Sequence, residues 1–359
     1  FLPKNVRVIR AFARDVSRHF SWRGKYPSVL ALPDNWQSWV LGGLVSGLLA
    51  ILKRRPRVIV STYPIASAHV IAYLLHRVTG VPWVADLRDP MAQMNYPTEP
   101  GRKRVFEWIE RKIVKHCSFA VVTAPGAQVL YQERFPGVDR DFWKIIPNGF
   151  DEDIFRAVKV PSYAAPTDRD PANPFVLLHS GIIYPSERDP SQLFVALAEL
   201  KQEGARNIDR LQLRLRATGH DQIYTPQIEQ LDIVDMVKLE PPISYMRALE
   251  EMLEVDALLL LQADNCNYQI PAKAYEYIRA NKPVLALTPA EGDTGKLLQQ
   301  VGVIDIAPLD DKNQIKAVLV NFIDKLNASE FAGINQSVVS QYSRQYQAAR
   351  CEALLKGII

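Results

Sequence analysis

The sequence predicts an α/β fold made of two doubly wound domains that face each other across a cleft. The length of 359 residues suits about two domains. From Arg57 onward, short apolar runs rich in β-branched residues and leucine alternate with helical stretches, which is typical of buried parallel strands joined by helices. A segment rich in Pro and Asp, 159–174, interrupts this alternation and has almost nothing to bury.

The first half of the alternating region predicts an incomplete parallel sheet. Its expected strands are 58–61, 83–86, 119–123 and 143–146, and its expected helices are 66–78, 102–115 and 126–135. The second half restarts after the linker, with expected strands at 175–179, 211–217, 237–239, 257–262, 284–287 and 303–306. Six strands that alternate with helices make a complete Rossmann-like domain.

These elements define the expected domain boundaries. They are an N-terminal, acceptor-side domain at 1–158, a linker at 159–174, a donor-binding domain at 175–335 and a C-terminal segment at 336–359. Residues 336–355 are expected to form one long helix that packs back toward the N-terminal domain. In sheets of this kind ligands bind outside the carboxyl ends of the strands, so a site is expected at the strand ends in the cleft.

The composition is that of a globular protein, with 48% hydrophobic and 23% charged residues. The three cysteines, Cys117, Cys266 and Cys351, lie far apart and form no CxxC pair. They therefore exclude a disulfide framework and a cysteine-rich zinc site, and they favour a reducing, cytoplasmic compartment.

Positive charge is concentrated at the N-terminal end. Residues 1–60 contain eleven Lys and Arg against only Asp15 and Asp34, although the whole chain carries a net charge of +4. This asymmetry predicts an anionic partner for 1–60, either phosphate or an anionic membrane surface at the inner face of the plasma membrane. No nucleic-acid-binding motif accompanies the charge, so nucleic acid is not expected as a partner.

Two apolar stretches lie within this basic region. The run 39–52 (WVLGGLVSGLLAIL) is too short to span a bilayer, and it predicts either a buried helix or a surface helix that dips into a membrane. Residues 6–20 place apolar side chains on one helical face with arginines beside it, which predicts a basic amphipathic helix. That helix either forms the outside of a domain or lies on a membrane.

The loops after two expected strands of the second half carry candidate phosphate-binding groups. Gly181 ends one strand, and Arg188 shortly precedes a helix. After another strand Pro271 begins a helix on which Lys273 and Glu276 are three residues apart. Backbone N–H groups at helix N-termini and basic side chains suit a diphosphate, and a carboxylate suits the two hydroxyls of a ribose. The alternatives are an ordinary turn with a solvated Arg188 and a surface ion pair between Lys273 and Glu276.

Five stretches of the chain together resemble a known family. They are STYPIASAH (61–69), VPWVADLRDP (81–90), IPNGFD (146–151), HSGIIYPSERDP (179–190) and IPAKAYEYIRANKPVLAL (270–287). The chain resembles retaining glycosyltransferases of the GT-B architecture, close to family 4. These enzymes pass between their domains at the segment that IPNGFD matches. They begin with a strand and a Gly-rich acceptor loop that are not found in 1–56, so the resemblance implies an incomplete N-terminal domain.

The resemblance implies roles for individual residues of the second half. Gly181 and Arg188 would contact the donor diphosphate, Ala272 and Lys273 would lie under the phosphates, and Glu276 would hold the nucleotide ribose. Glu276 matches the second of two glutamates in a motif of the family. The first glutamate stands eight positions earlier and contacts the donor sugar, and this chain has Tyr268 there. Tyr268 and Gln269 are therefore weaker candidates for the sugar contact.

In the first half, His69 resembles the family's sugar-side histidine, although a lone histidine also suits a structural role. Asp86 and Asp89 bracket Arg88 at the end of an expected strand. These three form either an internal salt bridge or polar contacts to the acceptor. His69, Arg188 and Lys273 are the candidate catalytic residues.

The expected activity is metal-independent transfer of a hexose from a nucleotide-diphosphate sugar to a glycan or glycolipid acceptor, with no separate cofactor. Negative charge on the departing diphosphate is expected to be stabilised by helix N-termini and basic side chains. No DxD stands at an expected strand end, and the sequence contains no nucleophile elbow, GxGxxG or Walker A motif. The alternatives are a nucleotide-sugar 2-epimerase and a non-catalytic nucleotide-sugar-binding protein.

Overall fold

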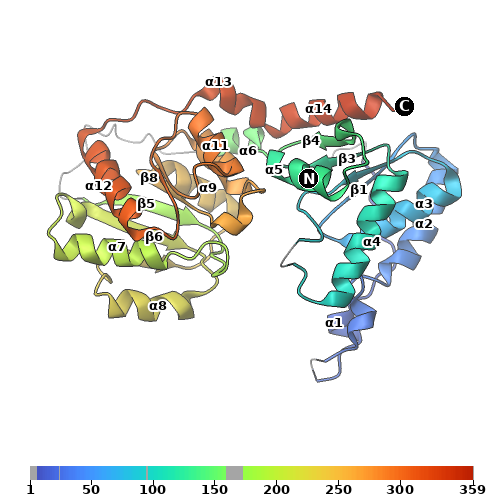
Figure 1. Ribbon diagram of the computed structural model, residues 1–359, viewed down its shortest axis with the longest axis horizontal. Helices are drawn as coiled ribbons and strands as arrows, with labels where there is room; N and C mark the ends of the chain where they lie inside the picture. Colours follow the sequence, from blue (N-terminus) through green and yellow to red (C-terminus); the bar gives the residue numbers. More distant parts are fainter. Residues whose placement is uncertain (1–5, 24, 94–95, 159–172, 359) are drawn as a thin grey trace. The chain divides into compact units, whose positions relative to one another are not determined.

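The computed structural model describes residues 6–23, 25–93, 96–158 and 173–358. The chain divides into two compact units (Figure 1). Unit 1 comprises 1–147 and 350–359, and unit 2 comprises 148–349. Both are α/β units with a fully parallel sheet, as the alternation of strands and helices predicts. The linker expected at 159–174 lies almost entirely outside the described residues.

Unit 1 contains a parallel sheet with the strand order β1-β2-β3-β4. The strands are β1 (Ile59–Thr62), β2 (Trp83–Asp86), β3 (Phe119–Val122) and β4 (Trp143–Ile145). The helices are α1 (Val16–His19), α2 (Trp39–Arg54), α3 (Ala66–Thr79), α4 (Pro100–His116) and α5 (Pro125–Arg134). The expected strands and the three expected helices between them are confirmed, with ends that differ by one or two residues.

Unit 2 contains a parallel sheet with the order β10-β9-β8-β5-β6-β7. Its strands are β5 (Phe175–Ser180), β6 (Leu211–Arg216), β7 (Val237–Glu240), β8 (Ala257–Leu261), β9 (Val284–Leu287) and β10 (Ile306–Ala307). Its helices are α6 (Glu152–Ala157), α7 (Ser191–Gln202), α8 (Asp221–Gln230), α9 (Tyr245–Glu254), α10 (Ala272–Ala280), α11 (Asp293–Gln300), α12 (Lys312–Ala328) and α13 (Gln336–Val339). This strand order is that of a doubly wound sheet.

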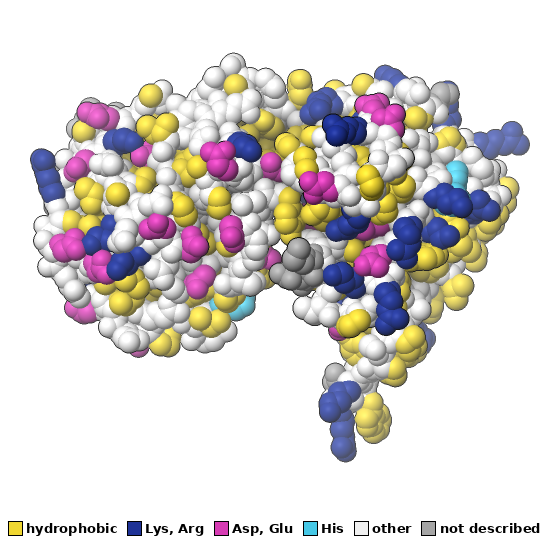
Figure 2. All heavy atoms as spheres, in the orientation of Figure 1, with side chains coloured by type: hydrophobic (Ala, Val, Ile, Leu, Met, Phe, Trp, Pro, Cys, Tyr) yellow, Lys and Arg dark blue, Asp and Glu magenta, His cyan; other side chains and the backbone are white. Residues whose placement is uncertain are grey.

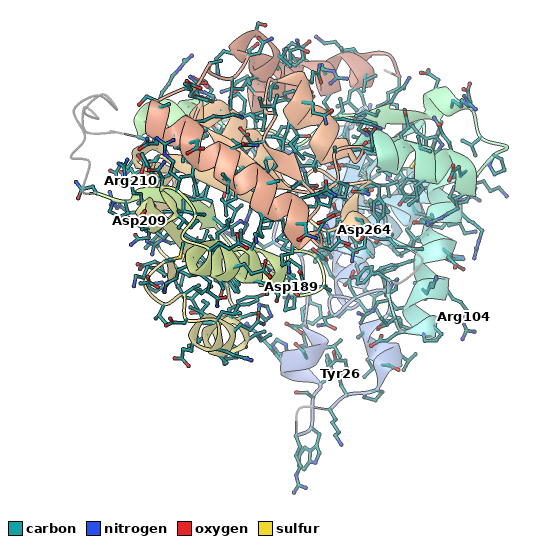
Figure 3. The ribbon with its side chains drawn as sticks, turned by 60° about the vertical axis from the view of Figure 1, so that its left-hand side comes forward. Tyr26, Arg104, Asp189, Asp209, Arg210 and Asp264 are labelled. Carbon is teal, nitrogen blue, oxygen red and sulfur yellow. The ribbon has the colours of Figure 1, made fainter. Side chains whose placement is uncertain are left out.

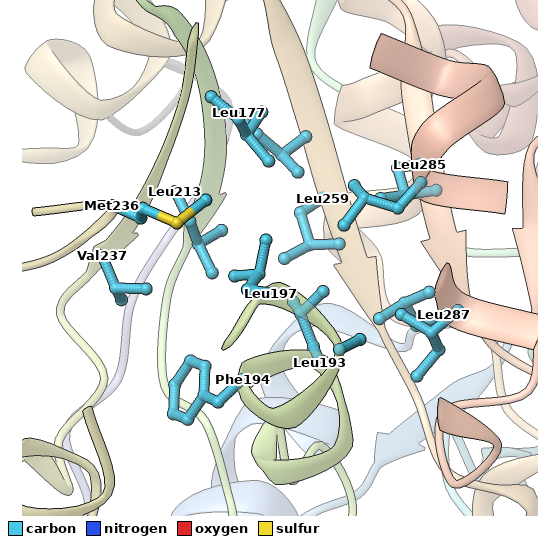
Figure 4. Close-up of a cluster of buried hydrophobic side chains, with 14 of the residues drawn as sticks. Leu177, Leu193, Phe194, Leu197, Leu213, Met236, Val237, Leu259, Leu285 and Leu287 are labelled. Atoms are coloured by element: carbon cyan, nitrogen blue, oxygen red, sulfur yellow. The ribbon is translucent and has the colours of Figure 1, made fainter. Parts of the chain in front are cut away.

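The core of unit 2 forms where helices cover the sheet. Leu193 and Leu197 of α7 pack with Leu213, Leu259 and Leu285 of three strands (Figure 4). All five residues of β8 are buried, because a central parallel strand is covered on both faces. The continuous leucine run is the sequence signature of that burial, and it makes the centre of the sheet a rigid base for the loops that follow the strands.

The prediction of a helix at 6–20 is wrong for most of that segment. Only Val16–His19 is helical, and 6–15 has no regular structure. The backbone of Arg14 instead exchanges hydrogen bonds with the Ser38 hydroxyl, which donates to the Arg14 carbonyl and accepts from its N–H. The backbone of Phe12 lies against Gly42, where a Cβ would collide with it. These tertiary contacts replace the bonds that a helix would make.

The prediction of a single helix at 336–355 is also wrong. It is broken into α13, a 3-10 turn at Ser340–Tyr342 and α14 (Arg344–Lys356). The break occurs where Phe150 pairs with this segment, because its N–H donates to the Tyr342 carbonyl and its carbonyl accepts from the Arg344 N–H. Side chains of 354–358 pack beside Val84, Phe119 and Val121 in unit 1.

The boundary between the units falls after Pro147, eleven residues before the expected end of the first domain at 158. Residues 148–158 belong to unit 2 because α6 is tied to α10. Glu152 accepts two hydrogen bonds from the Arg279 guanidinium, at 2.6 and 2.8 Å. The expected strand at 303–306 is likewise displaced, since β10 contains only Ile306–Ala307.

Helix α2 covers 39–52, for which the sequence left two interpretations open. It contains no buried residue, so the interpretation as a buried helix is wrong. In Figure 2 hydrophobic side chains lie at the surface of unit 1 where Figure 1 places α2. Within the described ranges, no helix has the length and apolar character needed to cross a bilayer.

A buried ionic network supports the loop that follows β2. Glu110 of α4 is fully buried, accepts a hydrogen bond from the Arg134 guanidinium at 2.7 Å and accepts another from the Tyr131 hydroxyl at 3.0 Å. It also accepts the Ala92 N–H, and the Tyr131 hydroxyl accepts the Met91 N–H. Burial raises the pKa of Glu110, while Arg134 opposes that shift.

We predict that Glu110→Ala lowers the free energy of unfolding of unit 1 by about 3–5 kcal/mol. The substitution removes the charge partner of Arg134 and the acceptor of the Ala92 N–H and the Tyr131 hydroxyl. All six tryptophans of the sequence lie in unit 1, so tryptophan fluorescence during urea unfolding reports on this unit. Glu107→Ala on the same helix is the control, since its ion pair with Arg111 is long (4.0 Å) and half-exposed. Equal midpoints for the two variants would contradict a structural role for the network.

Candidate functional site

The candidate site lies where the direction of strand crossover reverses in the sheet of unit 2. β5 pairs with β6 on one side and with β8 on the other, so the helices after β5 and β8 leave toward opposite faces of the sheet. The loop 181–190 follows β5, and the loop 262–271 follows β8. Figure 3 labels Asp189 and Asp264 in these two loops, and Asp209 and Arg210, which precede β6 at the other end of the sheet.

Gly181 is the first residue after β5. Its φ of +119° is unfavourable for residues with a side chain, and an added Cβ would lie 3.0 Å from the Lys273 Nζ. The Gly181 N–H donates to the carbonyl of Arg216, which extends the pairing of β5 with β6. Gly181 therefore allows the Lys273 ammonium to lie directly against the backbone at the end of β5.

Lys273 and His179 form the polar centre of the site. The Lys273 Nζ lies 3.0 Å from His179 Nε2, and the His179 Nδ1–H donates to the carbonyl of Leu259 at 3.0 Å. The Leu259 bond assigns the proton to Nδ1, so Nε2 is the acceptor for the lysine. His179 is fully buried, and burial lowers its pKa well below the ordinary value. A neutral His179 thus orients Lys273.

The protonation of Lys273 is poised near neutral pH. Burial is the main cause that lowers its pKa to about 7, the positive charge of Arg188 lowers it further, and Glu276 opposes the shift. A half-buried ammonium near a second cation is stabilised by any anion that binds between them. Lys273 is therefore the residue in this site whose environment most strongly favours an anionic ligand.

Arg188 lies in the loop after β5. Its guanidinium donates to the carbonyl of Ile182 at 3.0 Å and lies over the ring of Tyr184, 5.4 Å from the centroid. These contacts hold the guanidinium on the same loop as Gly181. Its charge lowers the pKa of both Lys273 and His179, which places Arg188 and Lys273 within electrostatic reach of each other.

The N-terminus of α10 lies at the same place. Pro271 is the N-cap and makes no side-chain capping bond, and Ala272 is the exposed first residue of this nine-residue helix. The first N–H groups of a helix have no partner within it and favour an anion. Together with Lys273 they form an electropositive end of the helix.

Glu276 lies one turn farther along α10. Its carboxylate accepts a hydrogen bond from the Tyr245 hydroxyl of α9 at 2.8 Å. Burial and the Glu276 carboxylate raise the pKa of Tyr245. The ion pair between Lys273 and Glu276 that the sequence left open is replaced by a Lys273–His179 contact and a Tyr245–Glu276 contact.

The loop that contains Tyr268 and Gln269 is held by its backbone. Gln262 donates through its side-chain amide to the carbonyls of Cys266 (2.7 Å) and Gln269 (2.9 Å). The Thr294 hydroxyl of α11 also donates to the Gln269 carbonyl. Both Tyr268 and Gln269 are half-buried. Their expected contact with a sugar stays a prediction.

Sequence reasoning identified Gly181, Arg188, Ala272, Lys273 and Glu276, and the structure brings all five to one end of the unit 2 sheet. Sequence reasoning missed His179, which orients Lys273, and Tyr245, which bonds to Glu276. It also missed Gln262, which holds the loop at Cys266 and Gln269. His179 is the last buried residue of β5, and a histidine at the end of an apolar run was the available signal. Nothing in the sequence indicates that α9 supplies a partner for Glu276.

His69 does not face a ligand, contrary to expectation. It is fully buried in unit 1, its Nδ1 lies 2.7 Å from the Ser61 hydroxyl, and the Trp83 indole N–H donates to the same hydroxyl. Burial lowers the pKa of His69 to about 3, so it stays neutral. These contacts are those of a structural histidine between α3 and β1, and the expected catalytic role has no support here.

Asp86, Arg88 and Asp89 lie at the carboxyl end of β2. The Asp86 carboxylate accepts the Thr62 hydroxyl at 2.8 Å and the Arg88 N–H at 3.3 Å, and burial raises its pKa. Arg88 has a φ of +47°, and its carbonyl accepts the Thr123 hydroxyl. Arg88 and Asp89 are both exposed. Polar groups held in an unusual backbone conformation at a strand end suit a binding role.

No cluster of three or more His, Cys, Asp or Glu suited to a metal ion occurs among the residues that the structure describes.

Comparison with known proteins gives one family match by sequence and several solved structures that share the fold. Residues 5–149 match the family model described as Glycosyl transferase 4-like domain, so the match falls on unit 1. A search of curated proteins finds no significant match by sequence.

Solved structures share the fold over most of the chain. The Anabaena protein HepE, solved in complex with UDP and glucose, is 16% identical with a TM-score of 0.65, over 88% of this chain and 81% of that chain. Sucrose-phosphate synthase from Thermosynechococcus elongatus is 13% identical with a TM-score of 0.64, over 96% and 82%. UDP-GlcNAc 2-epimerase from Methanocaldococcus jannaschii is 11% identical with a TM-score of 0.51, over 88% and 81%. The expected fold class, GT-B, is therefore confirmed.

We predict that Lys273 titrates near neutral pH. In protein whose lysines carry ¹³C-methyl groups, one resonance is expected to shift with a midpoint of about 7, because burial and Arg188 disfavour the ammonium. Lys273→Arg should lack that resonance, which assigns it. A midpoint in the ordinary lysine range would show that the Lys273–His179 pair is open to solvent.

Proposed function

We propose that this chain is a glycosyltransferase of the hexosyltransferase type, which moves a sugar from a nucleoside diphosphate sugar to a polysaccharide or lipid-linked acceptor. The observation that carries the proposal is the Lys273–His179 pair against Gly181 at the crossover point of unit 2. The match of unit 1 to the Glycosyl transferase 4-like domain supports the same activity.

The residues of unit 2 have a specific task in this proposal. The diphosphate binds at the N-terminus of α10, where Gly181 leaves room, Lys273 supplies one positive charge and Arg188 a second. A bound diphosphate raises the pKa of Lys273, so the lysine is fully protonated in the complex. Glu276, oriented by Tyr245, accepts the two ribose hydroxyls.

The proposed reaction proceeds with retention of configuration. The bond between the anomeric carbon and the β-phosphate oxygen breaks, and the acceptor hydroxyl oxygen bonds to the anomeric carbon on the same face. The acceptor proton passes to the departing phosphate oxygen, and nucleoside diphosphate is released. The charge that develops on that oxygen is stabilised by Lys273, Arg188 and the helix N–H groups, so we propose that no metal is required.

The acceptor side is assigned to unit 1. Asp86, Arg88 and Asp89 lie at the end of β2 and offer hydrogen-bond acceptors and a cation to hydroxyl groups. We propose that the acceptor is a glycan or glycolipid and that the protein acts in the cytoplasm, at the inner face of the membrane.

The second candidate function is a nucleotide-sugar 2-epimerase. It is favoured by the fold shared with UDP-GlcNAc 2-epimerase. Tyr268, which stands where the glycosyltransferase family has a glutamate, instead favours a non-catalytic nucleotide-sugar-binding protein. An epimerase also requires a nucleotide-sugar site, so the binding residues of unit 2 do not separate the two activities. The product does.

The decisive experiment begins with a thermal-shift panel of nucleoside diphosphates and nucleotide sugars, which identifies the donor class. The purified chain is then incubated with the labelled donor and a lipid or glycan acceptor fraction, with and without EDTA. Label in the acceptor, unaffected by EDTA, is the expected result. An epimerised nucleotide sugar would favour the second candidate, and binding without turnover would indicate a non-catalytic protein.

We predict that Glu276→Ala weakens binding of the stabilising nucleoside diphosphate by about 10- to 100-fold, the worth of a charge-assisted hydrogen-bond pair. The melting temperature without ligand is expected to change little, because the bond that the carboxylate accepts from the Tyr245 hydroxyl is exposed to solvent. Glu229→Ala on α8, an exposed position of unit 2, is the matched control. An unchanged ligand-induced shift in Glu276→Ala would refute the ribose role.

A further inference from the structure

Helix α2 exposes four large apolar side chains. Leu41, Val45, Leu49 and Leu52 are 73, 60, 64 and 73% exposed, and their spacing of four, four and three residues places them in one row along the helix. A surface helix ordinarily turns such a row toward the core. The described part of the chain leaves this row in solvent.

The inward side of α2 is made of glycines. A Cβ on Gly43 would lie 2.6 Å from Ile71 Cδ1, and a Cβ on Gly47 would lie 2.7 Å from Leu75 Cδ1. The two glycines therefore let α2 approach α3 closely. The leucines cannot be rotated inward without separating these helices, so the outward position of the apolar row is built into the packing.

The segment 6–14 adds exposed apolar side chains to unit 1 and meets α2 at one point. The backbone of Phe12 rests on Gly42 of α2, and the side chains of Val8, Ile9 and Phe12 are exposed. An apolar patch made of a helix and a neighbouring segment is larger than scattered surface leucines, and patches of this kind mark interaction sites.

The segment 6–57 is strongly basic. All the basic residues of the two bordering segments are exposed: Arg7, Arg10, Arg14, Lys53, Arg54, Arg55 and Arg57. The only acidic residues of 6–57 are Asp15 and Asp34. Asp15 caps α1, and Asp34 accepts the N–H and hydroxyl of Ser67 at 2.7 and 2.9 Å. Both carboxylates are therefore engaged within the fold.

We propose that α2 and the segment 6–14 form a docking surface for an anionic phospholipid bilayer. The row Leu41, Val45, Leu49 and Leu52 enters the boundary between headgroups and acyl chains, and the basic residues contact the lipid phosphates. The 16 residues of α2 make a helix of about 24 Å that lies in the plane of the surface. The partner is identified by charge complementarity, because the seven exposed cations suit the phosphate groups of an anionic bilayer. The proposal is independent of the transferase activity.

The test is co-flotation of the full chain with vesicles of phosphatidylcholine, alone or mixed with phosphatidylglycerol. Binding is expected to the mixed vesicles and to be weakened by high salt. The triple variant Leu41→Ser, Val45→Ser, Leu49→Ser should bind more than tenfold more weakly, since its apolar row is removed. The double variant Arg54→Gln, Arg57→Gln should lose about fivefold per charge.

Two substitutions outside the surface serve as controls. Val129→Ser on α5 removes an exposed valine, and Arg206→Gln removes an exposed arginine of unit 2. Both should float with the mixed vesicles as the parent does. Circular dichroism and the melting temperature of the triple variant establish that it is folded.

Three outcomes would overturn the proposal. They are equal binding to neutral and anionic vesicles, loss of binding in the controls as large as in the α2 variants, and no binding at all. Sedimentation without lipid tests the other occupant, a second copy of the chain. Concentration-dependent association of the parent that the triple variant lacks, together with no flotation, would assign the surface to self-association.

Discussion

The contact between Lys273 and His179 is the interaction on which the candidate site depends. It joins residues 94 positions apart, one on α10 and one in β5, and it forms only because β8 is placed beside β5 in the sheet. His179 is held by the carbonyl of Leu259 in β8, so one imidazole connects both strands to the lysine. Gly181 suits the same arrangement, because a Cβ there would lie 3.0 Å from the Lys273 ammonium and the φ of +119° favours glycine.

The two units present positively charged residues in two different arrangements. In unit 2 a buried lysine near Arg188 is precisely oriented and its protonation responds to its environment. In unit 1 exposed Arg and Lys residues surround an apolar row, with no free carboxylate among the described residues of 6–57. The first arrangement suits a small, fixed anion, and the second suits a diffuse anionic surface. A transferase with a soluble donor and a membrane acceptor would use both.

The local sequence pattern was sufficient to predict some elements and not others. The strands at 83–86 and 284–287 have the expected ends because a run of buried apolar residues between turn signals has few alternatives. The helix predictions for the segment 6–20 and the C-terminal segment were wrong. Ser38 and Phe150, which are distant in sequence, form hydrogen bonds with backbone groups that a helix would use. Helical periodicity in a sequence shows which side chains would share one face of a helix. Whether the backbone N–H and C=O groups bond within that helix or to a distant segment depends on the tertiary structure.

The sequence by itself determined the α/β class, the existence of two sheets and the five groups Gly181, Arg188, Ala272, Lys273 and Glu276. These follow from alternation and from turn and helix-start signals, which are local. Only the tertiary structure decided that His179 accepts from Lys273, that Tyr245 holds Glu276, that His69 is buried, and that α2 turns its leucines outward. Each of these depends on which distant segment lies next to the residue, and strand order and helix packing set that neighbour.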